Sequence, residues 1–155
     1  MQIKSVLCVC TGNICRSPLA EGWLRREMPS LNVSSAGIGA VQGGEMPSAA
    51  AAIAAREGLD LADHRGRQVT AGILQAHELV LVMEAGQRDW LGANFPESRG
   101  RTFVANHWAD GTDIQDPYRL SPDVFEQVYG EIVNALTQWQ KRLMPSAVTK
   151  NYGTR

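Results

Sequence analysis

The stretch VLCVCTGNICRSPLAEGWL, residues 6–24, decides the fold. Its first four residues form an apolar run, which is typical of a central parallel strand covered on both faces. A Gly-Asn turn follows, and the Ser-Pro pair at residues 17–18 predicts a helix start, because Ser caps free N–H groups and Pro fits the first helical position. Apolar residues then recur at helical spacing, which predicts a helix over residues 17–28 with Glu21 placed favourably toward the positive end of its dipole.

Outward from this stretch, strand and helix patterns alternate. Apolar runs predict three further strands over residues 32–36, 78–84 and 101–105. An Ala-rich stretch that ends at Gly58 predicts a helix over residues 48–57, and helical spacing predicts another over residues 121–143. Strands separated by helices predict an α/β fold in three layers, a central parallel four-stranded sheet with helices on both faces. Sheets of this kind bind ligands at the carboxyl ends of their strands.

The length and charge of the chain narrow the class of function. A chain of 155 residues suits one domain, predicted over residues 1–144, and the pattern is lost over residues 145–155, a predicted flexible tail. Fifteen Lys and Arg against sixteen Asp and Glu give a formal charge of -1, which argues against a nucleic-acid partner. No apolar run approaches the roughly 18 residues of a membrane span, and the first residues lead straight into a strand. We therefore expect a cytoplasmic protein without direct membrane insertion.

The turn between the first strand and the first helix holds Cys10 and Arg16, with five residues between them. A loop of this length can curl so that successive backbone N–H groups form an anion nest, and the following helix adds the positive end of its dipole. These groups and the Arg16 cation would stabilise a thiolate at Cys10, the form of cysteine that attacks. The guanidinium fork can bind two phosphoryl oxygens at once, and the Ser17 hydroxyl can donate to the sulfur as it departs. The turn therefore predicts a phosphocysteine mechanism.

The loop VCTGNICRSP, residues 9–18, resembles the phosphate-binding loop of the low-molecular-weight protein tyrosine phosphatases. Four more motifs follow in that family's order and approximate spacing: SSAG at 34–37, HRGRQV at 64–69, LVLVME at 79–84 and DPY at 116–118. The resemblance therefore covers about residues 3–143. The pair HW at 107–108, followed by DPYR at 116–119, is further similar to the bacterial branch associated with capsule and exopolysaccharide export.

The resemblance implies a tyrosine phosphatase that needs no cofactor or metal and releases inorganic phosphate. Its implied partners are phosphotyrosine proteins, in particular a membrane tyrosine autokinase. Asp116 is the implied general acid, which protonates a phenolate leaving group whose conjugate acid has a pKa of about 10. Such help is typically worth ~10²- to 10⁴-fold in rate. Pro117 restricts Asp116 to extended backbone, which fits a shaped loop.

The resemblance also implies supporting positions. The phosphate-binding loop comprises Thr11, Gly12, Asn13, Ile14, Cys15 and Ser17. Ser35 and His64 match positions that hold this loop in shape by hydrogen bonds, and Tyr118 would wall the cleft and pack on the substrate ring. Many members carry a second Tyr where this chain has Arg119, so we expect a thinner aromatic lining.

Two other classes of protein share features of this sequence. Arsenate reductases can have the same fold and loop, but the related kind needs two further cysteines for its disulfide relay, and no cysteine follows Cys15. A phosphopeptide-binding module needs the anion nest alone, whereas this chain also has Cys10 and Asp116. Zinc is disfavoured because the three cysteines lack the paired spacing of a zinc knuckle, and because a metal would compete with the bound anion.

Cys15 admits two interpretations. It can act as a resolving thiol that condenses with a sulfenic acid formed at Cys10, or it can simply fill space behind the loop. Cys8 alternates in the buried strand and is predicted to be a small core residue. Arg67 is predicted to lie on the solvated surface.

Overall fold

The computed structural model describes residues 2–144, and the tail predicted over residues 145–155 lies outside the described residues. The four strands are β1 (Ser5–Cys10), β2 (Asn32–Gly37), β3 (Leu79–Val82) and β4 (Thr102–Val104). They pair in parallel in the order β2-β1-β3-β4, so β1 and β3 are the central strands. The predicted parallel four-stranded sheet is confirmed.

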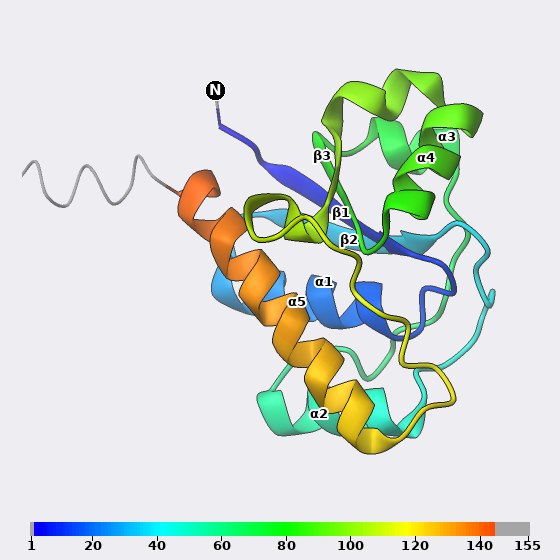
Figure 1. Cartoon of the computed structure of the whole chain (residues 1–155), viewed down its shortest axis with the longest axis vertical. Coiled ribbons are helices and arrows are strands. Elements are labelled where there is room, and N and C mark those ends of the chain that lie inside the picture. The colour runs from blue at the N-terminus through cyan, green and yellow to red at the C-terminus, as the bar shows by residue number, and fades with distance from the viewer. Residues whose placement is uncertain (1, 145–155) are drawn as a thin grey trace, which may run out of the picture.

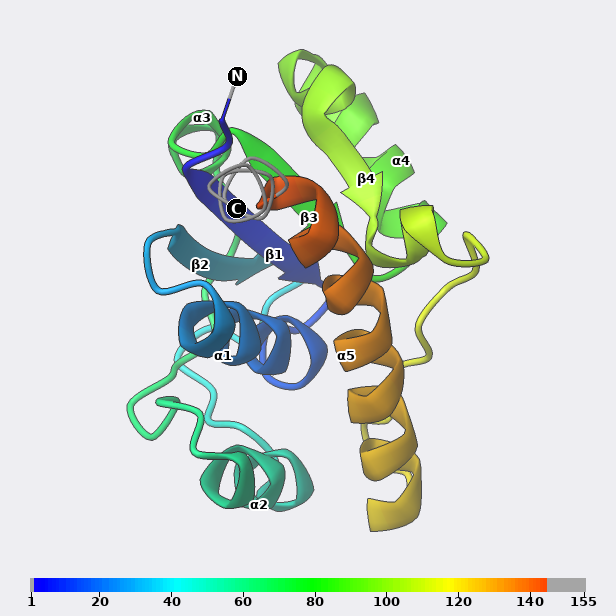
Figure 2. The ribbon, with the colours of Figure 1, turned by 90° about the vertical axis from the view of Figure 1, so that its left-hand side faces the viewer.

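Helices cover both faces of this sheet (Figure 1). One layer holds α1 (Arg16–Glu27), α2 (Ser48–Glu57) and α5 (Pro122–Leu143). The opposite layer holds α3 (Ala71–Gln75) and α4 (Ala85–Asn94). Two short 3-10 helices flank β4, η1 (Pro96–Arg101) and η2 (Ala105–Trp108). Figure 2 shows α1 and α5 side by side on the same face of the sheet, which completes the predicted three-layer arrangement.

The strand β1 is buried along its whole length because each of its faces meets a different helical layer. Val6, Cys8 and Cys10 belong to the larger core, which includes side chains of α1, α2 and α5. Leu7 and Val9 belong to the smaller core, which includes side chains of α3 and α4. Side chains alternate along a strand, so burial on both faces requires the apolar run seen in the sequence. It also leaves Cys10 as the last residue of β1, at the carboxyl edge of the sheet.

Two helices, α3 and α4, have no counterpart among the predicted elements. Both are short, and α4 contains two glycines, so neither shows a clear apolar stripe. Each is marked instead at its start: Thr70 Oγ1 accepts from the N–H of Ile73 (3.2 Å), and the N–H of Glu84 donates to Gln87 Oε1 (2.9 Å). Capping residues, rather than periodicity, were the available signal for these helices.

The helix α1 begins at Arg16, one residue earlier than predicted. Ser17 therefore lies inside the first turn, and its hydroxyl contacts Cys10 instead of capping the helix. Glu21 lies beyond the first turn, where its carboxylate accepts a hydrogen bond from Ser35 Oγ (2.5 Å). Both polar side chains thus form hydrogen bonds with residues outside the helix rather than with its N-terminal N–H groups.

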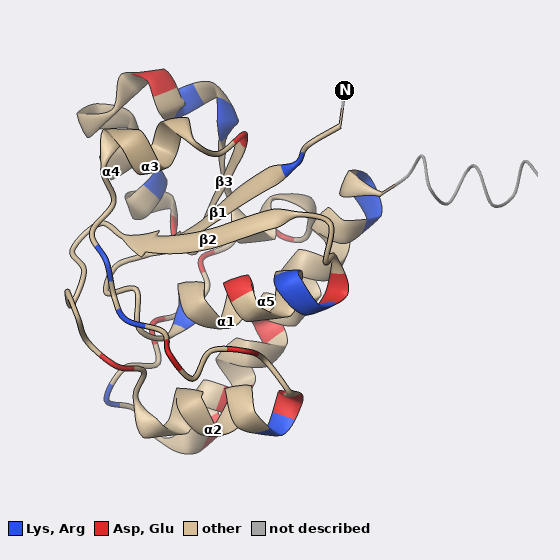
Figure 3. Cartoon of the chain, turned by 180° about the vertical axis from the view of Figure 1, so that it is seen from behind, with Lys and Arg blue, Asp and Glu red and all other residues tan. Residues whose placement is uncertain are grey.

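Charged residues lie on the helices and loops, and the four strands contain none (Figure 3). Opposite charges are neighbours at the ends of α1 and α2, where Arg26 pairs with Glu27 and Arg56 with Glu57. Exposed pairs of this kind contribute little to stability. None of the helices within residues 2–144 combines the length and apolar character needed to cross a lipid bilayer.

Candidate active site

The segment that joins β1 to α1, called here the cysteine loop (residues 10–17), lines a cavity of about 180 Å³. The residues that line this cavity are Cys10, Thr11, Gly12, Ile14, Cys15, Arg16, Gly39, Val41, Asp116 and Tyr118. They come from three segments that are distant in the sequence and follow the carboxyl ends of different strands. The parallel sheet brings the three segments together at one edge, where such folds place their ligands.

The sulfur of Cys10 is surrounded by hydrogen-bond donors. The backbone N–H of Asn13 donates to Sγ across 3.2 Å, and Ser17 Oγ lies 2.9 Å from Sγ. Asn13 Nδ2 donates to Ser17 Oγ (2.8 Å), so the hydroxyl proton of Ser17 is free to point at the sulfur. Both groups are donors suited to a negatively charged sulfur.

Asn13 holds the cysteine loop in its curled shape. Its φ of 57° lies in the left-handed region, which Asn tolerates better than most residues. Its side-chain amide also donates to Ser35 Oγ (2.9 Å), and its Oδ1 accepts from the N–H of Arg67 (2.9 Å). Its backbone carbonyl lies 2.7 Å from His64 Nε2. Every polar group of this buried residue therefore has a partner, which fixes its orientation from several directions.

A second layer of side chains holds the partners of Asn13 in turn. Ser35, on β2, donates to Glu21, which also pairs with Arg25 (2.5 Å). Arg67 Nε donates to the carbonyl of Ser35 (2.8 Å). Arg67 is exposed, as predicted, and its backbone and its side chain also bind groups next to the loop. Glu21 was not predicted as a supporting residue, although a carboxylate within the apolar run one turn after the loop was the available signal in the sequence.

Arg16 is only 2% exposed, and oxygen acceptors fix its guanidinium. Nη1 bonds to the carboxylate of Glu84 and donates to the carbonyl of Ile114 across 2.7 Å. Nη2 lies 3.8 Å from Asp116 Oδ2. A buried guanidinium is stable only with such partners. Glu84 is a site residue that we did not predict, although it ends the strand pattern beside β1 and so falls at the same edge of the sheet.

Backbone contacts tie the outer half of the loop to the segment after β2. The carbonyls of Thr11 and Gly12 accept hydrogen bonds of 3.0 Å from N–H groups of the segment 39–41. Thr11 Oγ1 also accepts from Gln87 Nε2 at the start of α4 (3.1 Å). The close approach requires glycine at position 37, since a Cβ on Gly37 would clash with the carbonyl oxygen of Thr11.

Asp116 reaches the cavity from the acid segment (residues 109–121), which lies between η2 and α5. Its side chain is 50% exposed, and its Oδ1 accepts from the N–H of Tyr118 (3.0 Å). The segment is anchored at Ile114, whose N–H donates to the carbonyl of Met83 just after β3 (2.9 Å). Asp116 is thus held at the cavity by local contacts while it stays open to solvent.

Cys15 is buried and lines the same cavity. Burial, with smaller contributions from the charges of Cys10 and Asp116, raises the pKa of the Cys15 thiol to about 12. Cys8 is fully buried in the larger core, as predicted. Of the residues that line the cavity, Tyr118 is the one aromatic side chain, as expected from Arg119 at the following position.

Comparison with known proteins agrees with this geometry. The family described as "Low molecular weight phosphotyrosine protein phosphatase" matches residues 5–149. The low molecular weight protein-tyrosine-phosphatase Etp of Escherichia coli K12 is 41% identical over 143 residues, which cover 92% of this chain and 97% of Etp. The crystal structure of the tyrosine phosphatase Wzb from Escherichia coli K30, in complex with sulphate, is similar with a TM-score of 0.87 and 39% identity. That similarity covers 92% of this chain and 99% of Wzb.

A structure with a different named activity is also similar. The YwlE arginine phosphatase from Geobacillus stearothermophilus matches with a TM-score of 0.86 and 30% identity, over 94% of this chain and 96% of YwlE. The family match, the identity to Etp and the similarity to Wzb all extend over most of the chain. The chain therefore belongs to the low molecular weight phosphotyrosine protein phosphatases.

Proposed function

We propose that this tyrosine phosphatase hydrolyses phosphotyrosine through a phosphocysteine intermediate, with Cys10 as nucleophile, Arg16 as oxyanion ligand and Asp116 as general acid and base. The observation that carries the proposal is that all three side chains line one cavity. Arg16 belongs to the cysteine loop, and Nη2 of its guanidinium lies 3.8 Å from Oδ2 of Asp116. A phosphoryl group bound by that guanidinium therefore has a nucleophile and a proton donor within the same small space.

In the first step the thiolate of Cys10 attacks phosphorus. The S–P bond forms while the bond from phosphorus to the phenol oxygen breaks, and the carboxyl of Asp116 gives its proton to that oxygen. Arg16 binds two phosphoryl oxygens, and its bonds to Glu84 and Ile114 orient the guanidinium before the substrate arrives. Backbone N–H groups of the cysteine loop bind the same oxygens.

In the second step water attacks the phosphocysteine. The carboxylate of Asp116 takes a proton from this water, the S–P bond breaks, and inorganic phosphate leaves. The sulfur departs as a thiolate, which the Ser17 hydroxyl and the Asn13 N–H can stabilise from 2.9 and 3.2 Å. The enzyme is then ready for another substrate.

The walls of the cavity favour an aromatic substrate. Ile14, Val41 and Tyr118 supply apolar contacts on which a phenyl ring can pack. A phosphoserine side chain is shorter than phosphotyrosine and has no ring to pack on these walls, so we expect it to bring its phosphoryl group to the buried sulfur of Cys10 less well. Phosphoarginine is the second candidate because of the similarity to YwlE. Its guanidinium would meet one carboxylate in the lining, Asp116, which the mechanism uses for proton transfer, so we propose tyrosine rather than arginine.

We further propose that the substrate is a membrane tyrosine autokinase of polysaccharide export, and that the enzyme acts in the cytoplasm. The support is the resemblance of the segments 107–108 and 116–119 to the bacterial branch of the family. Dephosphorylation of a purified, tyrosine-phosphorylated autokinase is the direct test. An enzyme that cleaves phosphotyrosine peptides but leaves that kinase phosphorylated would contradict this assignment.

Three peptides that differ only in the phosphorylated residue test the reaction itself. We expect kcat/KM to be high for phosphotyrosine and at least about 100-fold lower for phosphoserine and phosphoarginine, with the same values in EDTA. Acid quenching during turnover, followed by mass spectrometry, should place the phosphoryl group on the peptide that contains Cys10. Equal cleavage of phosphoarginine, or loss of activity in EDTA, would overturn the proposal.

A further inference from the structure

A turn at the mouth of the cavity has an unusual backbone. The N–H of Leu120 donates to the carbonyl of Pro117 (2.8 Å), which closes a four-residue turn in the acid segment. Arg119 occupies the third position of this turn with a φ of 68°. Turns with positive φ at this position strongly favour Gly or Asn. An arginine here is disfavoured by the backbone, so a contribution of its side chain is the first explanation to test.

The guanidinium of Arg119 lies next to the cavity. Its Cζ is 5.3 Å from the centre of the Tyr118 ring, and Tyr118 lines the cavity together with Val41. Tyr118, Val41 and Leu120 are each nearly half exposed, at 45%, 49% and 45%. Arg119 is therefore a cation set among exposed apolar side chains at the place where a substrate enters.

The carboxylates of the acid segment and its guanidinium, that of Arg119, differ in their hydrogen bonding. The three carboxylates of this segment each accept a hydrogen bond from a backbone N–H, Asp110 from Thr112, Asp113 from Ala85 and Asp116 from Tyr118. Within the part of the chain that the structure describes, the guanidinium of Arg119 has neither a hydrogen-bond acceptor nor a carboxylate within 4.0 Å. It is thus a cation free to pair with a group from outside.

We propose that Arg119 selects phosphotyrosine segments that carry a carboxylate side chain within three residues of the phosphotyrosine. The inference rests on the proposed function, because it needs a phosphotyrosine ring seated against Tyr118. With the ring in place, the flanking residues cross the rim beside Arg119, and guanidinium and carboxylate form a planar, two-point pair. The cation–π contact with Tyr118 keeps the guanidinium over the rim before the substrate binds.

Matched peptides test this selectivity. Each pair has the same sequence around phosphotyrosine, with Glu or Lys at one of the three positions on either side. For the wild type we expect kcat/KM to favour Glu over Lys by about tenfold at the best position in low salt, and by much less in 0.5 M salt. The ratio should approach one in Arg119→Asn, which suits the positive φ, and should invert in Arg119→Glu. Because each ratio compares two peptides on one variant, an effect on the chemical step cancels.

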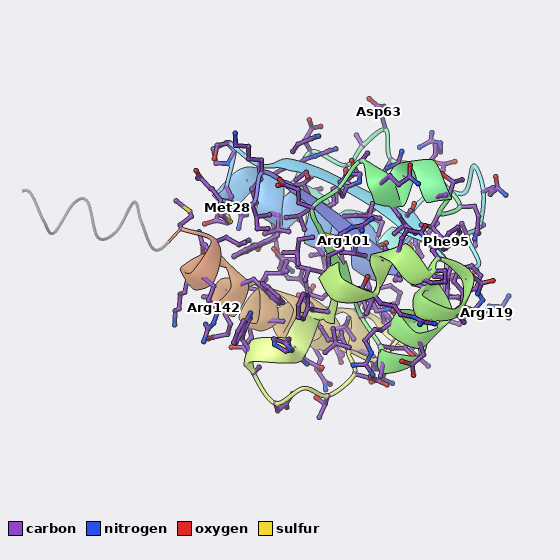
Figure 4. The ribbon with its side chains drawn as sticks, turned by 90° about the horizontal axis from the view of Figure 1, so that it is seen from above. Met28, Asp63, Phe95, Arg101, Arg119 and Arg142 are labelled. Carbon is purple, nitrogen blue, oxygen red and sulfur yellow. The ribbon has the colours of Figure 1, made fainter. Side chains whose placement is uncertain are left out.

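Arg142→Glu is the control for net charge. Arg142 is also a cation stacked on an aromatic ring, with Cζ 4.2 Å from the centre of Trp108, and it lies at the opposite end of the molecule from Arg119 (Figure 4). This variant should keep the wild-type ratio and the wild-type rate with p-nitrophenyl phosphate. An equal shift in Arg142→Glu, or a wild-type ratio of one at all six positions, would overturn the selectivity. Failure to cleave any phosphotyrosine peptide would instead overturn the proposed function.

Discussion

In the proposed mechanism the cysteine loop supplies the nucleophile and the acid segment supplies the general acid, yet the two segments are built in opposite ways. The loop is largely buried, and Asn13 within it has a partner for each polar group. The acid segment is mostly exposed, and the carboxylate of Asp116 accepts a bond from only two residues away. We infer that the nucleophile is fixed before the substrate binds, whereas the acid can follow the leaving group.

Removing the nucleophile should separate binding from chemistry. We expect Cys10→Ser to lower kcat by about 10⁵-fold or more, because a serine hydroxyl is far less ionised than a thiol. Phosphotyrosine peptide should still bind within about tenfold of the wild-type affinity, since backbone N–H groups and Arg16 remain in place. Calorimetry and initial rates measure the two effects. Cys8→Ala changes a cysteine of the same strand and should retain turnover.

Removing the acid should have an effect that depends on the leaving group. We expect Asp116→Ala to slow cleavage of phosphotyrosine by ~10²- to 10⁴-fold, because the phenolate must then leave without a proton. Cleavage of an aryl phosphate whose phenol is strongly acidic should be slowed much less, because that phenolate can leave without a proton. Asp110→Ala, which changes a carboxylate of the same segment, should leave both rates near wild type. Equal losses for the two leaving groups would show that Asp116 is not the acid.

Within residues 2–144, two non-glycine residues have a positive φ, and they allow a direct comparison of stability. We expect Asn13→Ala to lower the free energy of unfolding by about 3 kcal/mol, because it strains the backbone and removes the buried hydrogen bonds of the Asn13 amide to Ser17 and Ser35. Arg119→Ala should change it by less than about 0.5 kcal/mol, since that side chain is exposed. Asn13→Gly removes the strain and reports the hydrogen bonds alone. Urea denaturation measures all three, and similar losses at both positions would contradict the contrast.

The raised pKa of Cys15 allows the two interpretations of this residue to be separated, because a resolving thiol must act as a thiolate and its action must therefore depend on pH. With a pKa of about 12, roughly one Cys15 in 10⁵ is a thiolate at pH 7, and this fraction rises tenfold for each pH unit. After peroxide treatment, the share of oxidised protein with a Cys10–Cys15 disulfide, relative to sulfinic acid, should increase steadily from pH 6.5 to 8.5. Mass spectrometry of the loop peptide measures both products. A plateau below pH 8, or equal recovery of Cys15→Ser on reduction, would favour a packing role.

The four parallel strands and the turn that holds Cys10 and Arg16 could be predicted from local sequence, whereas the order of the strands in the sheet was not predicted. The apolar run of β1 indicates burial on both faces, and the residues that follow it line the cavity, so one continuous stretch contains both signals. Asp116 was found through the Asp-Pro motif and the family resemblance, because nothing in its local pattern shows that it faces Arg16. The structure places the two side chains 3.8 Å apart.

The supporting residues were harder to predict because their partners are distant in the sequence. Glu84 approaches Arg16 across 68 positions, and the N–H of Arg67 approaches Asn13 across 54. The N–H of Arg67 is a backbone donor, and every residue except proline has one, so the residue type does not reveal the partner of this group. The helices α3 and α4 were not predicted for a related reason. Short helices are stabilised mainly by packing against the rest of the fold rather than by their own sequence.

The complete pairing of Asn13 also bears on how this enzyme can evolve. A lone substitution at Ser17, Ser35 or Asn13 leaves a buried donor or acceptor without its partner, so mutations at these positions depend on one another. Arg119 has no such internal partner among the described residues, and a mutation there costs the fold little. We therefore expect single mutations at the rim to change substrate preference one at a time, whereas a change in the cysteine loop would need compensating mutations at the positions that bond to it.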